Sequence, residues 1–184
     1  MKSNTLKKKV ELMDESGVRR AMMRLSYEIV EKKTDLNSLI LVGIETRGVS
    51  LARMLQENLK KIADTDVELG SLNIKYYRDD LEKVAESPEL RKVDLPFSID
   101  GREVILVDDV IYTGRTVRAA IEALFDAGRP AKVRLAVLVD RGHRELPIRP
   151  DYVGKNVPTS QNEVIAVNIE EIDGFTGVEI LEKR

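Results

Sequence analysis

Two adjacent acids follow a short apolar run in the middle of the chain, where their carboxylates could meet a ligand. Residues 104–107 are all aliphatic, and Asp108 and Asp109 come directly after them. A run without polar alternation is typical of a strand covered on both faces of a parallel sheet. Open α/β sheets bind ligands at the carboxyl ends of their strands. The acids are therefore predicted to face the hydroxyl groups of a sugar, directly or through a metal ion.

A loop of small residues follows the acids and leads into a segment with helical periodicity at 117–124. Backbone N–H groups at the start of a helix, with the positive end of its dipole, hold phosphate groups. Gly114 removes the Cβ that would block close approach, and Thr113 and Thr116 offer hydroxyl donors. The pattern predicts a sugar phosphate site, and it differs from the P-loop, which needs a second glycine and a lysine. The alternative, acids that only cap the next helix, is disfavoured by the attached loop.

Residues 104–116 resemble the substrate motif of type I phosphoribosyltransferases, in which hydrophobic residues, two acids and a Thr-Gly-Arg-Thr or Thr-Gly-Lys-Thr loop follow in this order. The resemblance implies that phosphoribosyl pyrophosphate (PRPP) binds here. Mg²⁺ would bind through the substrate near the two acids, without a dedicated metal site. Asp108 and Asp109 are then catalytic candidates. The candidates for binding PRPP or a nucleotide in this motif are Val110, Tyr112, Thr113, Gly114, Arg115 and Thr116.

A second loop, residues 43–48, also follows an apolar strand and precedes a helix, so we expect it at the same edge of the sheet. It looks like the pyrophosphate loop of the same family, and it adds Thr46 and Arg47 to the binding residues. The resemblance implies a cis peptide bond between Thr46 and Arg47. Glu45 departs from the family, in which a basic residue is usual at this place. Without the first motif, the loop would be only a turn between a strand and a helix.

The stretch 78–96 is highly charged and has few apolar anchors, so we expect a mobile excursion. The family carries a flexible loop here, and the resemblance implies that this loop closes over the reacting diphosphate and excludes water. Arg78 is its catalytic candidate. The alternative is a solvated hairpin arm.

Residues 139–150 and 152–158 narrow the resemblance to bacterial regulators that attenuate pyrimidine operons and also act as uracil phosphoribosyltransferases. This family makes UMP and diphosphate from uracil and PRPP. The resemblance implies a small hood over the base, built from about 139–160 and parts of the termini, with Val139, Asp140 and Arg141 as base-binding residues. We find no convincing general base, because Tyr112 stands where some purine-using relatives have an acid.

One face of the first predicted helix carries Arg20, Met23, Arg24 and Tyr27, opposite its apolar stripe. Guanidinium groups and aromatic rings stack on splayed RNA bases, and the resembled regulators bind a stem-loop of the leader mRNA. Met23 and Tyr27 depart from the polar residues expected at these places. The alternative is a subunit interface, where the same residue types are enriched. The RNA-binding candidates are Arg20, Arg24, His143, Arg144 and Arg149.

Periodicity supplies the elements that must position these residues. Helices are predicted at 16–33, with Ser16 as N-cap, at 49–62, and after the second threonine of the phosphate loop as far as Gly128, which suits a left-handed cap. Strands are predicted at 38–43, 67–69, 72–77, 104–107, 133–139, 152–154, 164–169 and 178–181. Strand–loop–helix units in succession predict an α/β fold with a doubly wound, mainly parallel sheet flanked by helices, in a single domain over 1–184.

Composition sets the outer limits. The 184 residues are 42% hydrophobic and 34% charged, with no cysteine, which excludes disulfides, thiolate metal sites and a cysteine nucleophile. No apolar run approaches the roughly 20 residues that span a bilayer, and the first residues do not form a signal peptide, so we expect a cytoplasmic protein. The net charge of −2 argues against coating nucleic acid with the whole surface but allows a local basic patch.

Two functions remain in competition. The leading hypothesis is an RNA-binding regulator that makes UMP and responds to it, and the alternative is a uracil salvage enzyme without RNA regulation. An enzyme for purines is disfavoured by residues 139–158. In each case we expect a homo-oligomer, a dimer or larger.

Overall fold

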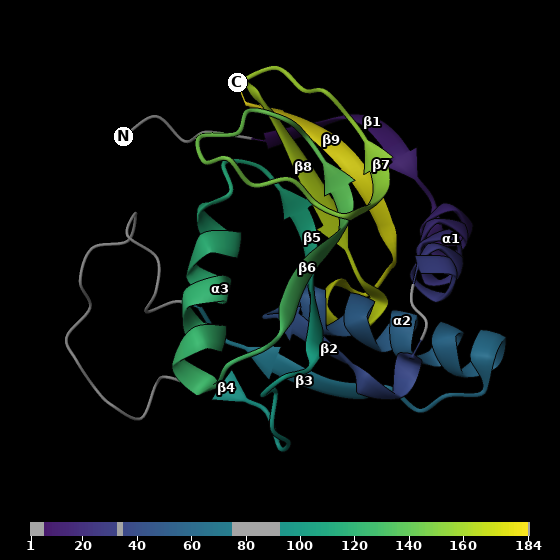
Figure 1. Cartoon of the computed structure of the whole chain (residues 1–184). Helices are drawn as coiled ribbons and strands as arrows, with labels where there is room; N and C mark the ends of the chain where they lie inside the picture. Colours follow the sequence, from purple (N-terminus) through teal and green to yellow (C-terminus); the bar gives the residue numbers. More distant parts are fainter. Residues whose placement is uncertain (1–5, 33–34, 75–92, 184) are drawn as a thin grey trace.

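The structure, a computed structural model, describes residues 6–32, 35–74 and 93–183. Within them, a central six-stranded sheet has the order β4-β3-β2-β5-β6-β7 (Figure 1). All neighbours in this sheet are parallel except β3 and β4. The strands are β2 (Leu39–Ile44), β3 (Glu68–Leu72), β4 (Val93–Asp94), β5 (Glu103–Ile111), β6 (Lys132–Asp140) and β7 (Tyr152–Asn156). The predicted mainly parallel, doubly wound sheet is confirmed.

Helices cover both faces of this sheet (Figure 1). Helices α1 (Glu15–Lys32) and α2 (Arg47–Ala63) pack on one face, and α3 (Arg115–Ala127) packs on the other. Alternate residues of β2 therefore enter different cores: Leu41 packs with α1 and α2, whereas Ile40 and Val42 pack with α3. This two-sided burial explains the apolar runs without alternation. None of the described helices is long and apolar enough to cross a membrane.

A second, antiparallel sheet of three strands contains both ends of the described chain (Figure 1). Its order is β1-β9-β8, with β1 (Leu6–Met13), β8 (Glu163–Asn168) and β9 (Gly177–Lys183). A short helix, α4 (Glu170–Asp173), connects β8 to β9, and a 3-10 turn spans Leu36–Ser38 before β2. Strand β1 was not predicted, because its residues are exposed from Leu6 to Glu11 and show no apolar pattern. The three tail strands are confirmed as β7, β8 and β9.

Helix α1 begins one residue earlier than predicted, and Ser16 does not cap it. The carboxylate of Asp14 accepts a hydrogen bond of 2.7 Å from the N–H of Gly17, while the Ser16 hydroxyl donates to Asp14. A carboxylate at this position satisfies a free N–H group and also favours the positive end of the helix dipole. Asp14 is therefore the N-cap.

Two further boundaries differ from the prediction. Helix α2 begins at Arg47 instead of residue 49. Strand β3 extends the first predicted run, 67–69, as far as Leu72. The second predicted run, 72–77, is a strand only at Leu72, since residues 73–74 are not in a strand and 75–77 lie outside the described residues. Arg78 and residues 78–92 of the predicted excursion lie outside the described residues, whereas Val93 and Asp94 at its far end pair with β3.

Gly128 ends α3 without the predicted left-handed conformation. Its φ of 175° is extended, which any residue can adopt. A Cβ at this position would lie 2.7 Å from Cγ1 of Ile99 and 2.9 Å from a carboxylate oxygen of Asp100. Glycine is needed here because the chain passes close to its neighbours, not because of its backbone angles.

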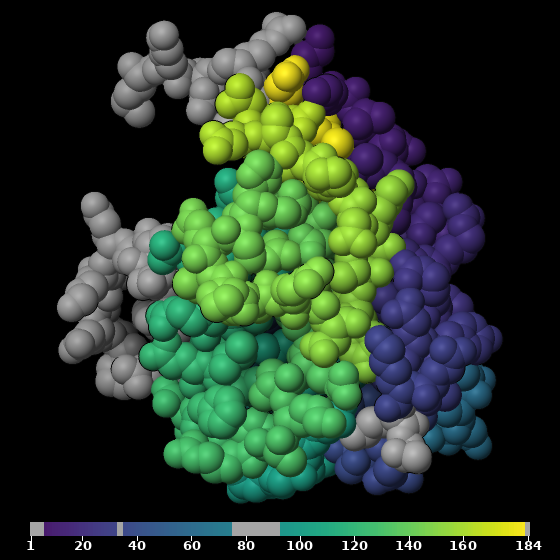
Figure 2. All heavy atoms as spheres, turned by 45° about the horizontal axis from the view of Figure 1, so that its top comes forward, coloured from purple at the N-terminus to yellow at the C-terminus, as the bar shows by residue number. Residues whose placement is uncertain are grey.

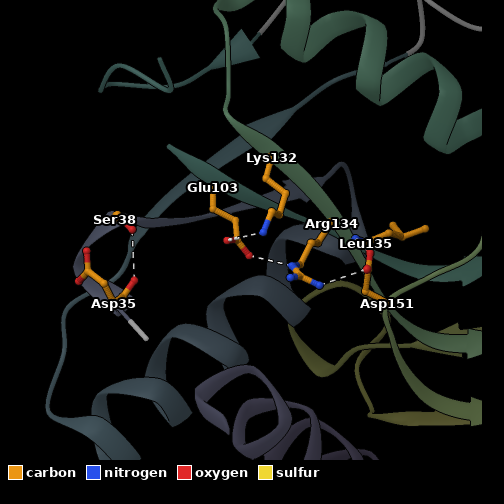
Figure 3. Close-up of polar contacts among 7 residues, drawn as sticks. All are labelled: Asp35, Ser38, Glu103, Lys132, Arg134, Leu135 and Asp151. Carbon is orange, nitrogen blue, oxygen red and sulfur yellow. Dashed lines mark hydrogen bonds and ion pairs between the residues drawn. The ribbon is translucent and has the colours of Figure 1, made fainter. Parts of the chain in front are cut away.

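Charged side chains pair with one another at the amino edge of the central sheet (Figure 3). Glu103, at the start of β5, accepts a hydrogen bond of 2.9 Å from Arg134 and lies 3.9 Å from Lys132. Asp151 contacts Arg134 and accepts a hydrogen bond from the N–H of Leu135. These acids are engaged in joining strands, so the sugar site must be sought at the opposite edge.

Candidate functional site

The two acids lie where β5 extends beyond its neighbour β2. Pairing between these strands ends at Gly43 and Val107, but β5 continues beside β6 as far as Ile111 and Asp140. The apolar run had suggested that Asp108 and Asp109 follow the strand, but they lie inside β5. Among the described residues, no residue of β2 pairs with β5 beyond Val107, so the acids lie at the carboxyl edge of the sheet.

The carboxylates are held close to their own backbone. Asp108 is only 7% exposed, and its Oδ1 accepts a hydrogen bond of 2.9 Å from the N–H of Asp109. Oδ1 of Asp109 accepts one of 2.7 Å from the N–H of Val110. Burial raises the pKa of Asp109, and the hydrogen bonds and the charge of Arg47 oppose that rise without cancelling it. The pair is an anionic site that gains from a cation or a positively charged ligand.

The loop 44–48 packs directly against the strand that carries the acids. A Cβ on Gly48 would lie 2.4 Å from the carbonyl oxygen of Val107 and 3.3 Å from Cα of Asp108. A Cβ on Gly43 would also be too close to backbone, at 2.4 Å from Cα of Val49. The loop 44–48 is thus held by close backbone contact against β5, the strand that carries the two acids.

The cis peptide bond of this loop joins Glu45 to Thr46, one residue earlier than predicted between Thr46 and Arg47. Both Glu45 and Thr46 are exposed. Arg47 is the first residue of α2, and its guanidinium donates to the carboxylate of Asp173 at 3.1 Å through Nε and at 2.7 Å through Nη2. Sequence reasoning missed Asp173, since no local pattern connects two residues 126 positions apart.

The predicted phosphate loop is the turn between β5 and α3. Gly114 has a φ of 93°, a left-handed conformation that favours glycine, and it immediately precedes the first residue of α3. Thr113 Oγ1 accepts a hydrogen bond of 3.3 Å from the N–H of Arg115. Gly114 is buried, and Thr113, Arg115 and Thr116 are partly buried. The turn presents the start of a helix beside the acids, as phosphate binding requires.

Residues 141–150, here called the covering loop, are hydrogen-bonded to the phosphate loop. The carbonyl of Thr113 accepts hydrogen bonds from the N–H groups of Glu145 at 2.9 Å and Leu146 at 3.1 Å. The side chains of Arg115 and Glu145 form an ion pair at 2.8 Å. The backbone of the phosphate loop and that of the covering loop therefore cannot move independently without breaking these bonds.

Arg144 adds a third connection to the same place. Its guanidinium donates to the carbonyls of Tyr112 and Ile148, both at 2.9 Å, and to the carboxylate of Asp140 at 2.5 Å. Asp140 also accepts from the N–H of Gly142 at 2.9 Å. Arg144 thus fixes the shape of the covering loop, a role that the sequence did not indicate.

All three base-binding candidates are engaged within the fold, Asp140 through the hydrogen bonds from Arg144 and Gly142. Val139 is fully buried in the core, so only its backbone is available to a base. The guanidinium of Arg141 is buried, donates to Thr159 Oγ1 and the carbonyl of Glu163, and stacks 4.1 Å from the ring centre of Tyr112. Tyr112 itself is 40% exposed. The Tyr112 ring, with the guanidinium of Arg141 on one face, therefore stands directly after β5, at the start of the turn that leads to α3.

The RNA-binding candidates line two cavities. Arg20 and Arg24 line one of about 470 Å³, together with Gly154 and Lys155 of β7. The other, about 560 Å³, is lined by residues that include Asp140, His143, Arg144, Arg149, Asn156 and Val157. Gly154 and Lys155 line the first cavity, and Asn156 and Val157, which follow them directly, line the second. Figure 2 shows the yellow-green part of the chain beside the purple N-terminal part.

These basic residues differ in their exposure and in the hydrogen bonds that they already make within the protein. Arg24 donates to Glu28 and to the carbonyl of Gly154, both at 2.5 Å, and Arg144 is used within the covering loop as described above. Arg20 and Arg149 are exposed, and Nε2 of the exposed His143 lies 2.5 Å from the carbonyl of Thr159. Tyr27 is 53% exposed and is available for stacking.

The oxygen ligands present suit a hard cation. In the described part of the chain, no three His, Asp or Glu residues are grouped so as to hold a metal ion. Two adjacent carboxylates at an open strand end can share a Mg²⁺ with substrate oxygens, which is the usual way in which this ion binds beside phosphates. The donor set therefore fits Mg²⁺ that arrives with its substrate.

Comparison with known proteins gives one consistent result. Residues 4–171 match the phosphoribosyl transferase domain family. The bifunctional protein PyrR of Enterococcus faecalis is 57% identical over 166 residues, covering 90% of this chain and 93% of that protein. The PyrR of Acetivibrio thermocellus is 55% identical over 172 residues, 94% of each chain.

Solved structures agree on the fold. The hypoxanthine phosphoribosyltransferase of Trypanosoma cruzi has a TM-score of 0.71 at 19% identity, covering 96% of this chain and 98% of its own. A hypoxanthine-guanine phosphoribosyltransferase of Bacillus anthracis has a TM-score of 0.72 at 19% identity, with 96% and 99% coverage. At these identities, the two structures establish the type of fold alone.

Proposed function

The chain belongs to the phosphoribosyltransferase family, in the group of bifunctional PyrR proteins, and from this premise we propose that it joins uracil to the ribose phosphate of PRPP and that the resulting UMP controls its binding to a stem-loop of pyrimidine-operon leader mRNA. The observation that carries the proposal is the convergence of Asp108, Asp109, the loop 44–48 and the phosphate loop at one sheet edge. Each of these parts suits one portion of a sugar with phosphate groups at both ends.

In the reaction, the bond between C1 of the ribose and the diphosphate oxygen breaks, and a bond from C1 to N1 of uracil forms as N1 loses its proton. Positive charge develops on the sugar ring as the diphosphate leaves. Asp108 and Asp109 lie where they would stabilise that charge, and Arg47 would stabilise the negative charge of the departing diphosphate. Arg78 stays a proposed contact and lies outside the described residues.

Mg²⁺, held by Asp108, Asp109 and the substrate, would neutralise phosphate charge and orient the diphosphate. The protein's own contribution is to bind the 5′-phosphate at the start of α3 and to exclude water. The covering loop stands beside the phosphate loop, where it would shield the sugar carbon from hydrolysis. We propose that the exposed ring of Tyr112 and the backbone of residues 139–141 contact the base.

The covering loop also offers a physical reason for control by UMP. Thr113, in the phosphate loop, accepts hydrogen bonds from the covering loop, and the same covering loop carries His143 and Arg149. A nucleotide phosphate that orders the phosphate loop would order these basic residues as well. UMP would then favour RNA binding because it binds the ordered form more tightly.

The enzymatic half is tested with purified protein, Mg²⁺, PRPP and labelled uracil. We expect release of UMP, and loss of turnover in Asp108→Asn combined with Asp109→Asn. Asp151→Asn is the matched control, since this carboxylate lies at the opposite edge of the sheet (Figure 3) and should leave turnover intact. Unchanged turnover in the double variant would remove the assigned chemistry, and a preference for hypoxanthine or guanine would remove the assigned base.

The regulatory half is tested by gel shift with a pyrimidine-leader stem-loop, with and without UMP. We expect retention that UMP strengthens at moderate salt, since attraction to phosphates alone is sensitive to salt and carries no specificity. Arg20→Ala should weaken retention about 10-fold. Arg19→Ala is the control, because Arg19 is an exposed neighbour on α1 that pairs with Glu15. If UMP has no effect on retention, the chain is a uracil salvage enzyme only.

A further inference from the structure

Arg47 of the pyrophosphate loop is held by a carboxylate from a distant part of the chain. Asp173 is the last residue of α4, the short helix between β8 and β9, and its two oxygens accept hydrogen bonds from Nε and Nη2 of Arg47. The side chains are only partly exposed, 34% for Arg47 and 18% for Asp173. A two-point pair of this kind fixes the plane of the guanidinium as well as its position.

The carboxylate of Asp173 is itself fixed. Its Oδ2 accepts a hydrogen bond of 2.9 Å from the N–H of Ile169, and α4 ends directly after it at Gly174, which has a φ of 80°. The hydrogen bond from Arg47 lowers the pKa of Asp173 below the ordinary value, with further contributions from the N–H of Ile169 and the charge of Arg47. Asp173 is therefore an ionised and immobile acceptor at neutral pH.

The contact leaves part of the guanidinium available to another acceptor. A guanidinium has five N–H bonds, and the pair with Asp173 uses one on Nε and one on Nη2. Arg47 is also close enough to Asp109 for the charge of each to affect the other. Arg47 is thus paired with Asp173 and lies within electrostatic reach of Asp109.

We propose that Asp173 is a positioning residue for this reaction: it holds the guanidinium of Arg47 so that the N–H groups it leaves free bind the diphosphate. The inference rests on the proposed function for the transfer from PRPP, and not for the identity of the base. The diphosphate belongs to any phosphoribosyl transfer from PRPP. The antiparallel sheet, which carries α4 between two of its strands, thereby takes part in binding the leaving group.

Helix α4 supplies its own control. Glu171, two residues before Asp173, accepts hydrogen bonds of 3.1 Å from Ser50 and from Arg53, both on α2, and has no contact with Arg47 among those described. Both acids attach α4 to the first turns of α2. Glu171→Gln therefore reports on docking of α4, whereas Asp173→Asn reports on docking and on the orientation of Arg47.

The decisive experiment measures binding of magnesium diphosphate by titration calorimetry, with KM for PRPP and for uracil measured in parallel. Asp173→Asn should weaken diphosphate binding about 10-fold, the effect of losing a charged hydrogen-bond partner, and raise KM for PRPP by a similar factor. KM for uracil should not change. Glu171→Gln should change each constant less than about 2-fold, as expected for an exposed pair.

Two outcomes overturn the proposal. Equal effects of Asp173→Asn and Glu171→Gln would make Asp173 an ordinary docking residue, and tighter diphosphate binding in Asp173→Asn would make it a competitor of the diphosphate. If Asp173→Asn does not fold, Asp173→Glu keeps the charge and displaces the carboxylate by one methylene, and about 3-fold weaker binding is expected, within the range for a misplaced charged hydrogen bond.

The calorimetric measurement requires no base. A failure of the uracil assignment would therefore leave this comparison of variants intact, and a failure of the comparison would leave the uracil assignment intact. In the background of Arg47→Ala, Asp173→Asn should have no further effect on diphosphate binding, because the group that Asp173 positions is then absent.

Discussion

Adding one methyl group at Gly48 should separate the pyrophosphate loop from β5, the strand that carries the two acids. The Cβ of Gly48→Ala would lie 2.4 Å from the carbonyl oxygen of Val107, about 1 Å inside ordinary contact. The obstacle is backbone in the middle of the central sheet, not the end of a flexible side chain. The pyrophosphate loop and the start of α2 must therefore move away from β5, and Arg47 moves with them.

Two magnitudes follow from that displacement. Overpacking of this kind costs about 1–3 kcal/mol of folding free energy. A misplacement of about 1 Å in a group that binds the reacting atoms costs roughly 100-fold in rate. We therefore expect kcat/KM for PRPP to fall by about two orders of magnitude, while the protein stays folded at 25 °C.

The assay is steady-state formation of UMP at saturating uracil, with a thermal melt of each variant. Gly101→Ala is the matched control: Gly101 has a φ of 69°, and its Cβ would meet nothing within 4 Å. That variant should lose about 1–2 kcal/mol through backbone strain and keep its kinetics. A Gly48→Ala enzyme with normal kcat/KM, or a Gly101→Ala enzyme with an equal kinetic loss, would refute the reasoning.

Three further variants test other parts of the structure. Asp109→Asn should raise the melting temperature at pH 7 while turnover is lost. Burial raises the pKa of Asp109 above 3.8 in the folded protein, so the stability of the folded protein falls as the pH rises from 3.8 through the raised pKa. The variant should remove this fall from a plot of melting temperature against pH. Arg144→Gln should raise KM for uracil about 10-fold with unchanged calorimetric binding of diphosphate, because the covering loop loses its bonds to Tyr112, Ile148 and Asp140; an equal loss in diphosphate binding would contradict this. Gly128→Ala should destabilise by about 1–2 kcal/mol through the contact with Ile99 and leave kinetics unchanged, which denaturant unfolding and initial rates will check.

The central sheet and the ligand-binding loops could be predicted because their signals are local. A strand buried on both faces has a continuous apolar run, as in residues 39–42 and 104–107, and a loop that binds phosphate needs small residues before a helix. Such patterns also located the acids, although not the extent of β5. That extent depends on which neighbour continues beside the strand, a property of the assembled sheet.

Features that depend on distant contacts left no local pattern. Strand β1 has six exposed positions out of eight and is a strand only because β9 pairs with it. Gly128 looked like a left-handed cap because the crowding by Ile99 cannot be read from neighbouring residues. The pair of Arg47 with Asp173, and the bonds of Arg144, likewise join segments that only the fold brings together.

Strand β1 also has a consequence for synthesis. Its hydrogen-bonding partner, Gly177–Lys183, leaves the ribosome after every other described element, whereas the central sheet is complete once β7 has emerged. While the rest of the protein folds, the nascent chain therefore carries the segment of β1 without its partner. Unpaired segments that can form a strand are templates for aggregation. Aggregation through this segment is opposed by the positive charges of Lys7, Lys8 and Lys9, because three like charges repel a second copy of the same segment. When the last strand arrives, Lys8 meets Glu179 and Lys9 meets Glu163, and the repulsion becomes attraction.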